Sequence, residues 1–253
     1  MAKEKYEDIA FKPETLRLLH ILEDIIRDYQ RQGYVLSLRQ LYYQMVARDH
    51  IPNNLRSYKR LGTIVKNGRM AGRLDWAGIE DRTREFICPQ RWADGRAILD
   101  AVANSYHEDM WVGQDRRVFV VVEKSALVGV LGPVCRRYDV PLLAAVGYPS
   151  PGVLRNFCLD DLVSAINARQ EPLVLHLGDH DPSGLDMTRD LQDRINVFAY
   201  RKIEVRRIAL NLEQVQELRP PPNPAKETDS RFKEYQRIYG SRCWELDAIA
   251  PRD

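Results

Sequence analysis

Apolar residues recur at helical spacing through the first third of the chain. Between Pro13 and Gly33, leucines and isoleucines fall three and four positions apart, which predicts an amphipathic helix that ends at the glycine. Ser37 is placed to cap a second helix and Asn54 a third. The stretch 73–84 that follows is predicted to form a β-wing. Three helices followed by a wing are typical of a winged-helix module of the helix-turn-helix class.

The pattern changes after a connector over residues 91–116, in which a helix is predicted around 96–106. Residues 117–122 form an unbroken β-branched and aromatic run, typical of a strand buried on both faces of a parallel sheet. Further strands and intervening helices are predicted at 142–146, 172–177 and 203–210, and at 127–138 and 153–168. This alternation predicts an α/β domain with a mostly parallel sheet. We therefore predict a helical winged-helix domain at 1–90, the connector, and an α/β domain with a C-terminal extension at 117–253.

Composition excludes several classes of protein. Apolar residues make up 44% and charged residues 29% of the chain, as in ordinary globular proteins. No apolar stretch approaches the roughly 20 residues needed to span a bilayer. The charged N-terminus lacks a signal-peptide core, which predicts a cytoplasmic protein. The four cysteines form no CxxC pair and are predicted to be buried small hydrophobes: Cys88, Cys135, Cys158 and Cys243.

Positive charge is concentrated in one strip, although the net charge of the chain is only +2. From Leu38 to Arg73, eight cations accompany a single acid, Asp49. Such a strip is typical of a surface that neutralises phosphates, whereas a solvated helical face would ordinarily mix both signs. We predict double-stranded DNA as the partner, and hence association with the nucleoid. The predicted contacts are Arg56, Lys59, Arg60, Lys66, Arg69 and Arg73.

Acidic residues stand at the ends of two predicted strands. Glu123 follows the first strand, and Asp179 and Asp181 follow the third. Ligands of open α/β sheets bind beyond the carboxyl ends of the strands, and residues two apart in an extended segment point the same way. Clustered carboxylates repel one another unless a cation neutralises them, and hard oxygen ligands suit Mg²⁺. The sequence therefore predicts a magnesium site.

Other interpretations of the DxD sequence fit less well. A calcium loop matches part of the spacing after Asp179, but Asp186 occupies a position where such loops need an apolar residue. An aspartyl-phosphate phosphatase would place its DxD near the first strand of the domain. A lone DxD is commonly a polar turn, which Glu123 at the end of a separate buried strand disfavours.

A strand ending in Glu and a later strand ending in DxD, with a small residue close behind, resemble the Toprim domain of topoisomerases, bacterial primases and some nucleases. The forms VVVEKSA at 120–126 and GDHDPSG at 178–184 resemble those of the topoisomerase VI A subunit and the meiotic transesterase that makes recombination breaks. The resemblance covers about Arg117 to Leu210. The short length is similar to that of the free-standing Mini-A versions found in bacteria and mobile elements.

The resemblance implies a Toprim fold and a set of metal ligands. Glu123, Asp179 and Asp181 would hold Mg²⁺, for which Mn²⁺ could substitute. Glu123 would also be catalytic, taking part in proton transfer when DNA is resealed.

The same family carries an Arg-x-x-Tyr-Tyr motif on a winged-helix domain, matched here by Arg39-Gln40-Leu41-Tyr42-Tyr43. Helix geometry separates the two tyrosines, because Tyr42 falls on the apolar stripe and Tyr43 lies off it, on the face of Arg39. We predict that Tyr42 is in the core and that Tyr43 is free to meet DNA. The Arg39 cation would favour the phenolate or hold a phosphate. An ordinary aromatic pair is the alternative for the dipeptide alone.

The implied activity is Mg²⁺-dependent cleavage and rejoining of DNA, as in type IIB topoisomerases. Tyr43 would become linked to the 5′ end and leave a free 3′ hydroxyl. In the family, the tyrosine of one protomer works with the metal of the other, which implies a homodimer. Strand passage would need a separate ATPase subunit, since no P-loop is present. A Toprim nuclease without a covalent intermediate and a DNA-binding module that does not cleave remain alternatives.

Two polar stretches near the C-terminus have turn residues at intervals, residues 223–231 and Trp244-Glu245-Leu246-Asp247. Packing over the metal site and contact with DNA are both compatible with this composition, and the sequence does not choose between them.

Overall fold

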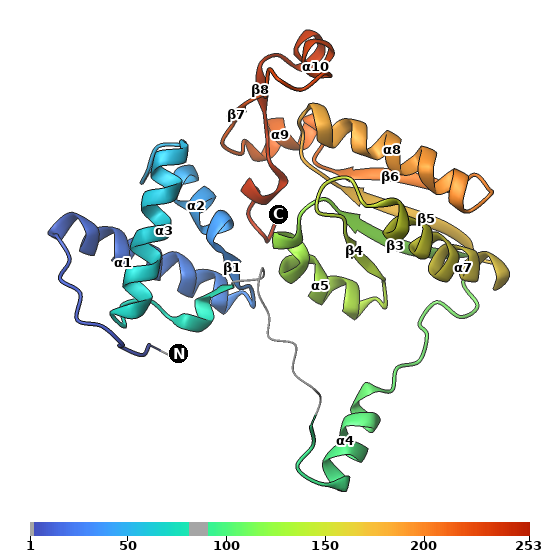
Figure 1. The fold of residues 1–253 in the computed structure, drawn as a ribbon, viewed down its shortest axis with the longest axis horizontal. Coiled ribbons are helices and arrows are strands. Elements are labelled where there is room, and N and C mark those ends of the chain that lie inside the picture. Colours follow the sequence, from blue (N-terminus) through green and yellow to red (C-terminus); the bar gives the residue numbers. More distant parts are fainter. Residues whose placement is uncertain (1–2, 81–90) are drawn as a thin grey trace.

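The computed structural model describes residues 3–80 and 91–253. The fold is of the mixed α/β class, with a helical N-terminal part and a parallel sheet in the second half, as the sequence predicts (Figure 1). Among the helices of these two ranges, none combines the length and the apolar character needed to cross a membrane.

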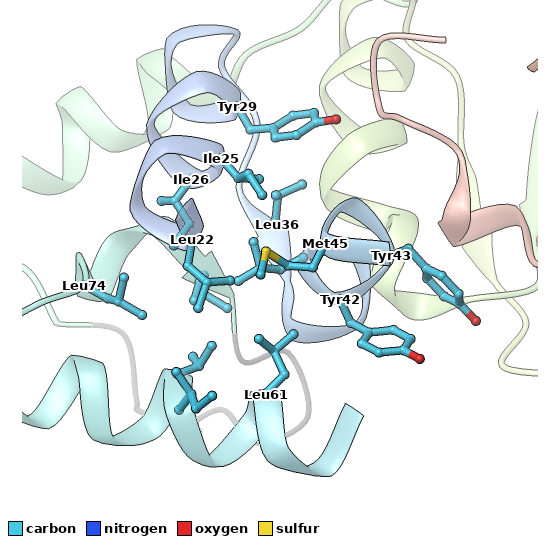
Figure 2. Packing of buried hydrophobic residues seen from close by; sticks show 14 of the residues in the cluster. Leu22, Ile25, Ile26, Tyr29, Leu36, Tyr42, Tyr43, Met45, Leu61 and Leu74 are labelled. Atoms are coloured by element: carbon cyan, nitrogen blue, oxygen red, sulfur yellow. The ribbon is translucent and has the colours of Figure 1, made fainter. Parts of the chain in front are cut away.

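The predicted N-terminal helices are confirmed as α1 (Pro13–Arg31), α2 (Leu38–Ala47) and α3 (Leu55–Met70). Ser37 caps α2 through a reciprocal capping box, and the side-chain oxygen of Asn54 accepts a hydrogen bond from the Ser57 amide at 2.8 Å. The three helices pack around one apolar core (Figure 2), which includes Leu22, Ile25, Ile26, Leu36, Met45 and Leu61.

The predicted wing is not a hairpin in its described part. Residues 76–78 form a 3₁₀ turn, and β2 (Ile79–Glu80) pairs in parallel with β1 (Leu36–Ser37). Residues 81–84 of the predicted wing lie outside the described ranges. The Arg69 guanidinium explains the path, because it donates to the carbonyls of Trp76, at 3.0 Å, and Ile79, and so holds this stretch against α3.

The connector contains the predicted helix, α4 (Gly95–Ser105). None of its residues is buried, and Figure 1 shows it standing apart from both the N-terminal helices and the sheet.

Four parallel strands form the sheet of residues 91–253, in the order β4-β3-β5-β6. They are β3 (Arg116–Val122), β4 (Leu142–Ala144), β5 (Glu171–Leu177) and β6 (Glu204–Ala209), which confirms the predicted strands. The inner strand β3 is buried over its last four residues, as its unbroken apolar run predicts.

Helices cover the two faces of this sheet unequally. On one face, α6 (Pro151–Asn156), α7 (Val163–Asn167) and α8 (Pro182–Phe198) share a large core with the strands, and a π-helical turn at 157–162 joins the first two. On the other face, α5 (Val128–Arg137) and α9 (Leu212–Leu218) contribute to a smaller core.

The C-terminal segment runs between the N-terminal helices and the sheet (Figure 1). It contains β7 (Asn223–Pro224), α10 (Phe232–Tyr239), β8 (Arg242–Cys243) and a 3₁₀ turn (Leu246–Ala248). Leu246 packs into the smaller sheet core, and Ala248, two residues later, packs into the core of the N-terminal helices. The segment thus joins the two halves.

The cysteines of the described ranges are free and buried, as predicted, at Cys135, Cys158 and Cys243. Cys88 lies outside those ranges.

Candidate active site

Parallel pairing of β3 and β5 brings two of the predicted acids together. Val122 is in register with Leu177, so Glu123 and Asp179 leave the same edge of the sheet. The Asp179 amide donates to Glu123 Oε2 at 2.9 Å. The prediction that Glu123 and Asp179 lie close together is therefore confirmed.

Asp181, the third predicted metal ligand, makes a structural contact that the sequence analysis did not predict. It is the N-cap of α8, and its Oδ1 accepts hydrogen bonds from the Gly184 amide at 2.6 Å and the Ser183 hydroxyl at 2.9 Å. These contacts engage Oδ1 of Asp181, and its role as a metal ligand stays a prediction. The charge of Asp181 still acts on Glu123, whose pKa is raised first by burial and further by Asp181.

A tighter acidic cluster is formed by Asp179 with Glu245 and Asp247. One carboxylate oxygen of each lies within 4.8 Å of the others. Asp179 Oδ1 also accepts from the Leu246 amide at 2.8 Å, which fixes the C-terminal segment over the strand ends. Of the two roles left open for this segment, the structure shows packing over the site.

Glu245 and Asp247 were not among the predicted site residues. The available signal was their spacing, since acids two apart in an extended stretch face the same way. The strand directly before them, β8, belongs to a separate two-stranded sheet, so the rule that located Glu123 and Asp179 at the ends of parallel strands does not apply to them.

Two cations neutralise part of this cluster. Lys124 Nζ lies 2.9 Å from Asp179 Oδ2 and 2.9 Å from Asp247 Oδ1, and it also pairs with Glu245. Arg39 pairs with Glu245, and its Nε lies 3.0 Å from Asp247 Oδ2. Burial disfavours the charged lysine, but the three carboxylates outweigh it and hold the pKa of Lys124 above its ordinary value.

The donor set fits a hard divalent cation. Three carboxylates face two cations here, so negative charge is in excess. Burial raises the pKa of Asp179 against the opposing charge of Lys124, and Glu123 adds to the rise. The Asp247 side chain is 0% exposed, and its Oδ2 lacks a hydrogen-bond partner of good geometry. Carboxylate oxygens in this arrangement suit Mg²⁺ or Mn²⁺. The ammonium of Lys124 lies among these oxygens, so a metal would have to displace it or bind beside it.

The prediction that Tyr43 is free to meet DNA is wrong for this structure. The residue is 4% exposed, because the C-terminal segment covers it and Asn223 Nδ2 donates to its hydroxyl at 3.1 Å. Arg39 shares its face as predicted, with the guanidinium 5.9 Å from the ring centre. Tyr42 is buried as predicted, and its hydroxyl donates to Asn53 Oδ1 at 2.9 Å. Both rings lie at the edge of the helical core (Figure 2).

The environment of Tyr43 favours the neutral phenol. Burial, reinforced by the charge of Glu245, raises the pKa of Tyr43 to about 12, and the opposing effects of Arg39 and Asn223 are smaller. The predicted influence of Arg39 on the phenolate has the expected direction, but burial outweighs it. An attack by Tyr43 would therefore require the C-terminal segment to move off the ring or a base to take the phenolic proton.

Most of the predicted DNA-contacting strip is accessible. The exposed members are Arg56, Lys59, Arg60, Lys66 and Arg73. Arg60 is engaged by Glu14 at 2.7 Å. The assignment of Arg69 to this surface is wrong, because its side chain turns inward to the two carbonyls after α3 and the residue is only 8% exposed.

Sequence comparisons with known families and curated proteins give no match: no protein-family model matches the chain, and no curated protein is significantly similar to it. The acidic cluster, its two cations and the neighbouring tyrosine are therefore the basis for any functional conclusion.

Proposed function

We propose that this protein binds double-stranded DNA and cleaves and rejoins it by transesterification at Tyr43, with Mg²⁺ at the acidic cluster. The proposal includes a winged-helix role for the N-terminal helices and a Toprim role for the α/β part. The observation that carries it is a single contact network. Asn223 Nδ2 lies 3.1 Å from the Tyr43 hydroxyl and 3.5 Å from Glu245 Oε1, and Arg39 joins the tyrosine ring to the same acid.

The proposed reaction exchanges one phosphate ester bond for another. The Tyr43 oxygen attacks a phosphodiester phosphorus, its proton passes to solvent water, and the bond from phosphorus to the 3′ oxygen breaks. The 3′ oxygen takes up a proton and becomes a free hydroxyl, while the phosphate stays on the tyrosine. Arg39, whose side chain is 45% exposed, is placed to hold the phosphate. A bound divalent metal would stabilise the charge that develops on phosphate oxygens.

The position of Tyr43 bears on whether it would work with the metal of its own protomer or with that of a second protomer. Tyr43 lies beside the acidic cluster of its own chain through Asn223. The resemblance to topoisomerase VI implies instead that it serves the metal of a second protomer. Both arrangements give the same covalent product, so the test does not depend on the choice.

A covalent-adduct assay tests the proposal. Protein is mixed with end-labelled DNA in Mg²⁺ or Mn²⁺, denatured, and separated with and without protease. With the label at the 3′ ends of the DNA, we expect labelled fragments that carry protein on their 5′ ends until protease removes it, reduced to background in Tyr43→Phe and in Asp179→Ala. Tyr42→Phe is the matched control, because it removes a neighbouring buried hydroxyl that bonds Asn53 and should leave the adduct. An adduct that survives in Tyr43→Phe would contradict the proposal.

A metal-dependent nuclease is the second candidate. It is favoured by the burial of Tyr43 and by its pKa of about 12, since a hydrolase would not need this tyrosine. The same gel separates the two, because DNA ends without attached protein, formed equally by wild type and Tyr43→Phe, would identify hydrolysis.

The basic strip gives a separate prediction for binding. Lys59→Ala and Lys66→Ala together are expected to reduce the slope of log affinity against log salt by roughly 0.9 for each phosphate that the protein no longer neutralises. The effect should be similar for unrelated DNA sequences, because phosphate contacts carry no sequence information. Fluorescence anisotropy over a salt series measures it. Arg201→Ala, at an exposed position beyond α8, is the control, and an equal change there would mean that α3 is not the binding surface.

A further inference from the structure

The connector helix α4 presents an apolar face that nothing in its own chain covers among the described residues. Ile98, Leu99 and Val102 share this face with Tyr106 just beyond the helix, and all four are exposed, Leu99 by 69%. The helix has eleven residues and an Asp94 cap. Isolated helices shorter than about 12–15 residues are marginal in water, so α4 needs a packing partner.

The same chain leaves an apolar groove open on the sheet. Its volume is about 630 Å³, and it lies on the face that α6, α7 and α8 do not cover. Its lining includes Val118, Val120, Leu131, Val134, Leu175 and Ile208. Parallel strands are ordinarily covered by helices on both faces, and α5 and α9 do not fill this part. The groove therefore has the shape and the apolar lining of a binding site for an amphipathic helix.

We propose that α4 of one protomer docks in this groove of a second copy of the chain, and that the second copy returns the contact. The residues after α4 are held at the groove's own end, because Trp111 Nε1 donates to the carbonyls of Tyr138 and Asp139 at 3.0 and 2.9 Å. From this anchor α4 extends away from its own sheet (Figure 1), which leaves the groove free for another chain.

The expected interface area favours two reciprocal contacts, in which each α4 docks in the groove of the other protomer, over one contact alone. An eleven-residue helix is about 16 Å long and about 10 Å wide, so one helix in one groove buries well under the roughly 1,200 Å² of a stable interface. A two-fold arrangement doubles the area with the same residues. Neither Tyr43 nor the acidic cluster takes part, so this inference goes beyond the proposed function and can fail independently of it.

The oligomeric state of the full chain tests the proposal. Light scattering after gel filtration should give twice the 29.4 kDa chain mass for wild type. Leu99→Asp should raise the dimer dissociation constant by about 100-fold or more, because it places a charge at the centre of each contact. Asn104→Asp adds the same charge on the opposite face of α4 and should leave the dimer intact. A monomeric wild type, or a dimer unaffected by Leu99→Asp, would overturn the proposal.

Cysteine pairing distinguishes a second copy from the chain's own groove. A Val102→Cys chain is mixed with a tagged Val134→Cys chain, so any disulfide between the two sites joins different chains. Oxidation is expected to give the tagged heterodimer in the mixture. If a chain carrying both cysteines instead closes a disulfide within itself and the mixture gives none, α4 folds onto its own sheet and the proposal is wrong.

Discussion

Lys124→Met is expected to lower the free energy of unfolding by about 3–5 kcal/mol, the usual cost of removing one partner from a buried ion pair. The lysine contacts Asp179, Glu245 and Asp247, and its own side chain is largely buried. Without it, Glu245 and Asp247 keep their ion pairs with Arg39, and Asp179 loses its ion pair with the lysine. Urea unfolding followed by circular dichroism measures the change. Lys66→Met, at an exposed position of α3, should change stability by no more than about 0.5 kcal/mol.

Added metal should reverse part of this loss. A divalent ion that binds only the folded protein raises stability in proportion to the logarithm of its concentration over its dissociation constant. We expect Mn²⁺ to raise the melting temperature of Lys124→Met more than that of wild type, in which the ammonium competes for the same oxygens. An equal response of both proteins would show that the cluster is not the metal site, whatever the outcome of the cleavage assay.

The second large effect is expected at Arg207, whose guanidinium supports the loop that carries Asp179. It donates to the carbonyls of Gly178 at 2.8 Å, Asp179 at 2.6 Å and Gly184 at 2.9 Å. Arg207→Met should cost about 3 kcal/mol or more, because these carbonyls lose a charged donor. The measurement is again urea unfolding.

The neighbouring residue on β6 supplies the control for this prediction. Arg206 points to the opposite side of the strand, where it pairs with Glu204 in an exposed position. Arg206→Met should therefore change stability by no more than about 0.5 kcal/mol. Equal losses in the two variants would mean that the loop does not depend on Arg207.

Local signals in the sequence predicted the elements well. The caps at Ser37 and Asn54 predicted the starts of two helices, because the side chains that cap them act within three residues. The unbroken apolar run of β3 predicted a buried parallel strand, since burial on both faces removes the alternation of polar positions. Glu123 and Asp179 were located by the same logic, as the ends of paired strands.

The predictions that failed concern contacts that a helix makes with residues outside it. Arg69 was assigned to the basic surface because its charge matches its neighbours, but the turn after α3 provides carbonyls that draw it inward. Tyr43 lies off the apolar stripe of α2, yet a segment about 180 positions later covers it through Asn223. Helical periodicity describes one helix and the core beneath it, and it contains no information about which remote segment lies on the other face.

The stretch from Asn223 to Ala248 contacts the tyrosine, the two cations of the acidic cluster and the N-terminal helices, and so links these parts of the site. Asn223 covers the tyrosine, Glu245 and Asp247 hold the two cations, and Ala248 is embedded among the N-terminal helices. Because one piece of chain carries all of these contacts, the tyrosine cannot be uncovered by moving this piece without disturbing the partners of Lys124 and Arg39. Access to the hydroxyl and the charge balance of the cluster are thus coupled, and the coupling free energy is the same whichever of the two is changed first.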